Sequence, residues 1–199
     1  VAAMVLVIIL VIWLVPVIPV DIFGALIITV FGFFFATVAS RIVGLVGSSN
    51  NPVSGMTIAT LLIATVIFKA IGMTGQSGMT GAIAVGSIIA IIAAISGDTS
   101  QDLKTGYIVG STPQKQQIGE LLGVIISALA IGGILYLLNA AWGYGSAELP
   151  APQAVLMKMV VEGVMDGNLP WTLVFIGAGI AVVVEILGIP VLPFAVGLY

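Results

Sequence analysis

The sequence contains no cysteine and no histidine. Without cysteine there can be no disulfide, and without both residues the usual zinc and haem ligand sets are excluded. Serine or cysteine catalysis of the common kind needs a histidine base, which the chain does not have. We therefore expect no catalytic residue, no metal site and no cofactor.

Charged residues are also scarce. They make up 7% of the chain, whereas hydrophobic residues make up 60% and the mean hydropathy is +1.31. A soluble domain usually carries about 25% charged residues, so most of this surface must face lipid. No cluster of Lys and Arg is present, which excludes nucleic acid as a partner. We predict an integral membrane protein of the cell membrane, plasma or inner, with the lipid bilayer as its surroundings.

Long apolar runs give the expected fold. A bilayer core of about 30 Å needs roughly 20 apolar residues per helix, and these runs do not alternate as barrel strands do. The prediction is an all-α, polytopic transmembrane helical bundle with about six membrane-spanning helices plus broken or half-helix segments. The expected helices are 1–18, 22–40, 53–71, 79–96, 118–139 and 171–187.

The stretches between these runs differ in character. Residues 97–117 predict a polar break, residues 143–170 an external or interfacial segment, and residues 188–199 an incomplete apolar segment interrupted by Pro190 and Pro193. Both ends of the chain lie inside apolar runs, so we expect one membrane domain that is part of a longer polypeptide. The remainder of that polypeptide would then be a partner of this segment.

A cluster of capping residues precedes the third run. Asn50, Asn51 and Pro52 come before Ser54 and Gly55, in a pattern typical of a capped helix start. Free N–H groups at such an end attract anions or carboxylates, so Asn50, Asn51, Ser54 and Gly55 are candidate binding residues. The alternative is an ordinary capped helix at the membrane face.

The densest polar cluster lies in the predicted break. Asp98, with Gln101 three residues later, fits a capping box, and Asp98 and Asp102 would then share one helical face with Lys104 to the side. Capping alone would explain this pattern. As an alternative, Asp98, Asp102 and Lys104 are candidates for substrate binding or proton coupling.

A polar stripe enters the fifth run. Thr112-Pro113 predicts a helix start, after which Gln116, Glu120, Gly123 and Ser127 recur at i, i+4, i+7 and i+11. A carboxylate is costly in hydrocarbon, so Glu120 is a candidate proton-responsive site with Gln116 beside it; the alternative is an interfacial Glu exposed to water. Glu185 is a further candidate, because it precedes the break at Pro190.

Four segments carry a resemblance to a known family. The stretches 49–57, 96–106, 112–120 and 185–199 are similar to the oligopeptide transporter family, including its yellow-stripe-like branch. The resemblance implies a secondary active transporter of small peptides, or of metals held by an organic chelator, coupled to protons. Family members are much longer, which implies that this chain is an internal or C-terminal part of one.

Other classes of function remain as alternatives. A channel also uses glycine-rich breaks and capped half-helices, and a structural subunit of a membrane complex would explain apolar helices. A presenilin-type protease needs Gly-x-Gly-Asp, but Ile95 stands where the first glycine should be.

Overall fold

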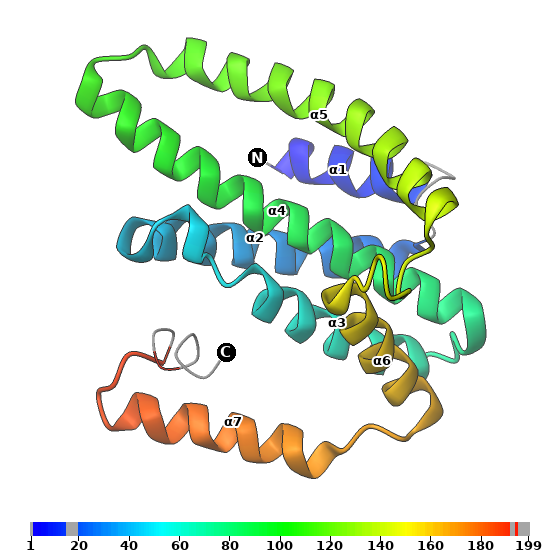
Figure 1. Ribbon diagram of the computed structural model, residues 1–199. Coiled ribbons are helices and arrows are strands. Elements are labelled where there is room, and N and C mark those ends of the chain that lie inside the picture. Colours follow the sequence, from blue (N-terminus) through cyan, green and yellow to red (C-terminus); the bar gives the residue numbers. More distant parts are fainter. Residues whose placement is uncertain (1, 15–19, 192–193, 195–199) are drawn as a thin grey trace.

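A computed structural model describes residues 2–14, 20–191 and 194 (Figure 1). This part of the chain is helical and has no strand, which confirms the all-α prediction. Its elements, in chain order, are α1 (Ala2–Leu14), α2 (Ile22–Val46), the short 3-10 helix η1 (Ser48–Asn50), α3 (Val53–Ala70), α4 (Gly75–Val109), α5 (Pro113–Ala141), α6 (Pro152–Asp166) and α7 (Trp171–Ile186).

Four of the described helices are long and apolar enough to cross a membrane, namely α2, α3 together with η1, α4 and α5. A fifth span results if α6 and α7, which meet at 118°, form one broken crossing. About six spans were expected. The described part of α1 has 13 residues and α7 has 16, fewer than the roughly 20 that a full crossing needs. The end of the 1–18 run and most of 188–199 lie outside the described residues.

The predicted polar break at 97–117 is wrong over most of its length. Helix α4 continues for 35 residues and ends only at Gly110, whose φ is +77°, and α5 begins at Pro113. Contacts with α2 hold the helix in this region: the Ser40 hydroxyl donates to the Ser96 carbonyl at 3.1 Å, and the Ser100 hydroxyl donates to the Ser40 carbonyl at 3.1 Å. Polar side chains that could have ended the helix instead join it to its neighbour.

The core lies where α4 packs along α2 and α3. Gly86 of α4 permits a close approach, because a Cβ there would lie 2.6 Å from Leu61 Cδ2 of α3. Three threonines of α3 are fully buried in this core, and each hydroxyl donates to the carbonyl four residues earlier. The polar atoms are thus satisfied within the helix, as the membrane interior requires. These threonines are Thr57, Thr60 and Thr65.

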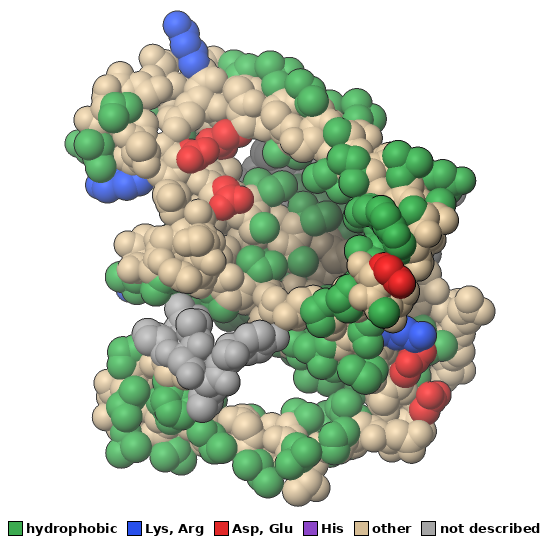
Figure 2. Space-filling view, in the orientation of Figure 1, with side chains coloured by type: hydrophobic (Ala, Val, Ile, Leu, Met, Phe, Trp, Pro, Cys, Tyr) green, Lys and Arg blue, Asp and Glu red, His purple; other side chains and the backbone are tan. Residues whose placement is uncertain are grey.

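The segment expected to be external or interfacial contains α6, which packs against α3 and α4. Val161 and Val164 are buried in this contact, and Lys69 at the end of α3 donates to the Val164 carbonyl at 2.8 Å. Helices α5 and α7 lie at the periphery (Figure 1). The surface is open between α7 and the rest of the molecule (Figure 2), and most of the large hydrophobic side chains of α5 and α7 are exposed.

Candidate functional site

A groove of about 910 Å³ lies between α4 and α5. The two helices form an antiparallel pair joined by a tight connection at Gly110–Thr112 (Figure 1). One part of the groove is polar, and the other part is lined by isoleucine, leucine and valine. The polar lining residues are Asp98, Thr99, Asp102, Gln117, Glu120 and Ser127, and the apolar ones include Ile91, Ile95, Leu121, Val124 and Ile131. The groove therefore combines an acidic end with an apolar wall, and acidic side chains lie beside this hollow in the space-filling view (Figure 2).

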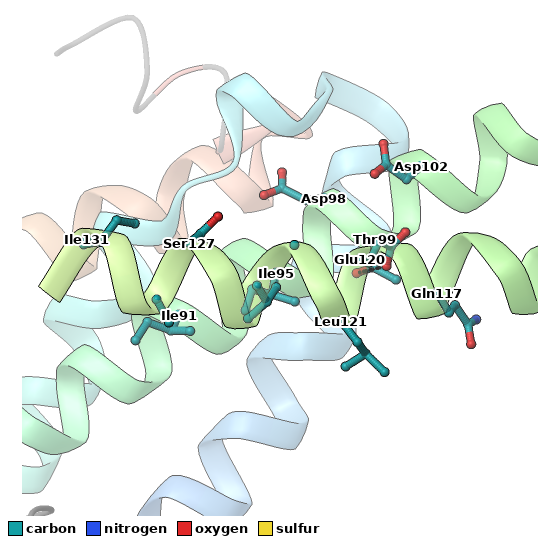
Figure 3. Close-up of a pocket in the computed structure, with 13 residues that line it drawn as sticks. Ile91, Ile95, Asp98, Thr99, Asp102, Gln117, Glu120, Leu121, Ser127 and Ile131 are labelled. Carbon is teal, nitrogen blue, oxygen red and sulfur yellow. Dashed lines mark hydrogen bonds between the residues drawn. The ribbon is translucent and has the colours of Figure 1, made fainter.

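Glu120 makes a direct contact across the groove. The hydroxyl of Thr99 on α4 donates to Oε2 of Glu120 on α5 at 2.9 Å, and the two side chains lie against each other in Figure 3. The other carboxyl oxygen, Oε1, is buried and has no hydrogen-bond partner. Because an unpaired buried polar atom is costly, this oxygen is available to accept a hydrogen bond from a further donor.

Asp98 and Asp102 line the same groove from α4, one turn apart. Both are exposed. Asp98 lies inside the helix and not at its start, so the predicted capping box is wrong, because an N-cap residue must have a non-helical backbone. The shared face of Asp98 and Asp102 follows instead from their spacing within one continuous helix. Within the part of the chain that the structure describes, no group of three acidic side chains could hold a metal ion.

Gln116 packs against α4 one turn before Glu120. Its Nε2 donates to the carbonyl of Asp102 at 2.5 Å, and its side chain lies directly over Gly106. Gly123 and Ser127, further along α5, line the groove. These residues share one face of α5, as their spacing predicts, and in the structure this face lies against α4.

The start of α3 differs from the expected cap. Pro52 occupies the N-cap position, and no side chain caps the helix. The amide of Asn50 instead donates to the Val46 carbonyl at 3.2 Å, and that of Asn51 to the Ala93 carbonyl of α4 at 3.0 Å. Asparagine side chains can bond to either a helix end or a neighbouring backbone, and here the close approach of α4 favours the second.

The remaining candidates of this helix start play no part in those contacts. Ser54 is half-buried in the first turn of α3, and Gly55 is exposed, with open space where a Cβ would stand.

Two other predicted site residues lie away from the groove. The Lys104 ammonium lies 5.4 Å from the centre of the Tyr107 ring, and Lys104 lines a smaller cavity of about 510 Å³ beside the end of α2. Glu185 is exposed on α7, which makes no close backbone contact with the other described helices. The described structure therefore brings Asp98, Asp102, Gln116 and Glu120 together, and leaves Lys104 and Glu185 outside.

Sequence reasoning missed Thr99 and Gly97 as contact points. Thr99 would have been found if α4 had been recognised as continuous, because it then lies one position after Asp98 on the groove side. Gly97 carries no signal of its own, whereas Gly106 forms a G-x-x-x-G step with Gly110 that is typical of close helix packing but does not identify the partner.

Comparison with known proteins finds relatives among membrane transporters. A family model described as OPT oligopeptide transporter protein matches residues 1–199. A putative oligopeptide transporter of Haemophilus influenzae is 32% identical over a region covering 84% of this chain and 31% of that protein. No solved structure matches.

Plant relatives match over shorter regions. The probable metal-nicotianamine transporter YSL8 of Arabidopsis thaliana is 27% identical over 56% of this chain and 17% of its own length. YSL10 of Oryza sativa subsp. japonica, of the same description, is 29% identical over 46% of this chain and 14% of its own length. The chain thus spans less than a third of these relatives. The matched family comprises transporters and not enzymes, and the match runs the whole length of the chain: the chain belongs to the OPT oligopeptide transporter family.

Proposed function

We propose that the full-length protein is a secondary active transporter in the cell membrane, plasma or inner, that moves small peptides or peptide-like metal chelates and is driven by protons. Family membership supports the substrate class, because the relatives are described as oligopeptide and metal-nicotianamine transporters. Peptides and such chelates share amino and carboxylate groups on a compact organic frame.

The chemistry of the groove suits such a substrate. Asp98 and Asp102 offer carboxylates to a substrate ammonium group, whereas the wall around Ile91 and Ile131 can take an apolar side chain. Since no Lys or Arg lines this groove, its described part favours the cationic end of a substrate.

The proposal of proton coupling is based on the surroundings of Glu120. It is a titratable group on a helix of membrane-spanning length, with one oxygen bonded to Thr99 and the other buried without a partner. Protonation would remove a charge from the contact between α4 and α5. Binding of a proton could therefore change both the charge of the groove and the Thr99–Glu120 contact between its two helices.

Uptake by the purified full-length protein in liposomes tests this function. Radiolabelled trialanine and an iron–nicotianamine complex would be offered separately, with the outside acidified and with no pH difference. We expect saturable uptake of at least one probe, accumulation only with the pH gradient, and its loss on adding a proton ionophore. Flux that rises linearly with probe concentration would indicate a channel, and accumulation insensitive to the ionophore would exclude proton coupling.

A further inference from the structure

Two side-chain amides make the same contact with α4 at two places. Asn51, just before α3, donates from Nδ2 to the Ala93 carbonyl and lies over Gly97. Gln116, in the first turn of α5, donates from Nε2 to the Asp102 carbonyl and lies over Gly106. In each case the accepting carbonyl belongs to the residue four positions before the glycine.

Helix geometry explains this repetition. The carbonyl of residue i−4 already accepts the N–H of residue i, and its second lone pair is free. The side chain of residue i normally screens that carbonyl, so only glycine lets another residue's amide reach it. A Cβ on Gly97 would lie 2.7 Å from Asn51 Nδ2, and one on Gly106 would lie 2.9 Å from Gln116 Cδ. Both distances are far below ordinary carbon contacts.

The two contacts enclose the polar part of α4. Gly97 directly precedes Asp98 and Thr99, and Gly106 follows Asp102 by one turn. Asn51 approaches from the α3 side, whereas Gln116 approaches from α5, one turn from Glu120. The side-chain oxygens of both amides are buried without a hydrogen-bond partner, and the side-chain N–H groups of both donate to the α4 backbone.

We propose that these two side-chain amide contacts with the α4 backbone fix α3 and α5 on α4 and hold Thr99 against Glu120. We call the contact of Asn51 at Gly97 the first lock and that of Gln116 at Gly106 the second lock. Asn51 and Gln116 are then positioning residues and not substrate ligands. The inference rests on the proposed function where it is tested by uptake measurements. Its test by distance measurements does not require that the protein transports either probe.

Distance measurement in the full-length protein tests the second lock directly. This segment has no cysteine, so after removal of any cysteines elsewhere, spin labels can be attached at Ile91→Cys and Ile131→Cys on the two walls of the groove. We expect Gln116→Ala and Gly106→Ala each to shift or broaden the distance distribution between α4 and α5. The combination should match Gln116→Ala alone, because the side chain that a methyl at position 106 would strike is then gone. Gln114→Ala and Gly119→Ala are controls in the same part of α5, and position 119 has open space for a Cβ.

Uptake kinetics give the second readout. A positioning residue should lower the maximal rate, by roughly five-fold for the loss of one hydrogen bond, change the pH profile set by Glu120, and leave KM nearly unchanged. Asn51→Ala tests the first lock in the same way. Unchanged distances in both Gln116→Ala and Gly106→Ala, or additive effects in their combination, would overturn the proposal. So would a raised KM with unchanged distances in Gln116→Ala, or a raised KM with an unchanged maximal rate in Asn51→Ala. If no probe is transported by the unmodified protein, the proposed function fails, whereas the distances still decide whether the second lock exists.

Discussion

At the residue scale, the contact between Thr99 and Glu120 joins two helices through a single hydroxyl and a single carboxyl. The threonine donates, so the glutamate oxygen accepts in either protonation state. The second oxygen, Oε1, has no partner and is buried. The contact with Thr99 therefore satisfies only one of the two carboxyl oxygens.

We expect Glu120→Gln in the full-length protein to reduce gradient-driven accumulation by roughly ten-fold or more, the range of a typical coupling free energy. Glutamine keeps the size and can still accept from Thr99, but it cannot titrate. Substrate exchange without a gradient should continue. Uptake and exchange in liposomes would be compared across pH, and an unaltered pH dependence of uptake would show that Glu120 has no part in coupling.

Gly86 permits the close approach of α3 and α4, so Gly86→Ala should destabilise the protein. The added Cβ would lie 2.6 Å from Leu61 Cδ2, and Leu61 is 1% exposed and has little room to move. Overpacking of this kind typically costs about 1–3 kcal/mol. Thermal unfolding of the full-length protein in detergent would measure the loss. Gly133→Ala, with open space around its Cβ, is the matched control and should leave the midpoint nearly unchanged.

The residue pattern predicted that the polar residues of α5 share one face, but it predicted neither the helix opposite that face nor the role of each residue. The spacing of Gln116, Glu120 and Ser127 defines one helical face whatever lies opposite. Asn51 and Asp98 were interpreted as caps because their side chains bond to the backbone equally well at a helix end and across a helix contact. The choice between these depends on α2, α3 and α4 meeting in space, which is information that local sequence does not contain.

At the scale of elements, α4 departs most from the sequence interpretation. Apolar length predicted the existence of α2, α3, α4 and α5, since each contains a run close to the bilayer thickness. The end of α4 differed because polar residues continue this helix beyond its apolar part, and α2 differed because it continues past Arg41 through a mainly apolar stretch to Val46. Hydropathy detects where lipid stops and not where helical hydrogen bonding stops.

Hydrogen exchange distinguishes these two boundaries. If α4 is continuous, backbone amides from Asp98 to Val109 should exchange slowly in the full-length protein, like those of the preceding turns. Those of Thr112, Gln114 and Lys115, at the uncapped start of α5, should exchange fast. Mass spectrometry of deuterated peptides would measure both. Fast exchange beginning at Asp98 would restore the polar break that the sequence suggested.

At the scale of the whole molecule, the helices fall into a packed centre and a sparse periphery. Helices α2, α3 and α6 each contact α4, and α3 also contacts α2 and α6, whereas α5 contacts α4 alone among the described elements. The chain spans 31% of the Haemophilus relative. The groove is lined by α4 and α5 among the described helices. In the full-length protein, other segments of the polypeptide would complete its lining.

Residues 1–199 alone should not transport, because a carrier of this kind needs a second part to move against around its site. Liposomes containing only this segment are expected to show no gradient-driven uptake of trialanine or iron–nicotianamine, while liposomes with the full-length protein do. Circular dichroism would first establish that the isolated segment is helical. Uptake by the isolated, folded segment would show that the described groove suffices.

The unbroken length of α4 sets its geometry in a bilayer. At 1.5 Å per residue its 35 residues extend about 52 Å, well beyond a hydrocarbon core of about 30 Å. The first charged residue, Asp98, comes about 35 Å from the start, so the hydrocarbon boundary falls near the Thr99–Glu120 contact, and the last turns project into the headgroups or the water beyond. Because α4 is continuous, a change in its tilt of about 10° about its first turn would displace its C-terminal end by about 9 Å.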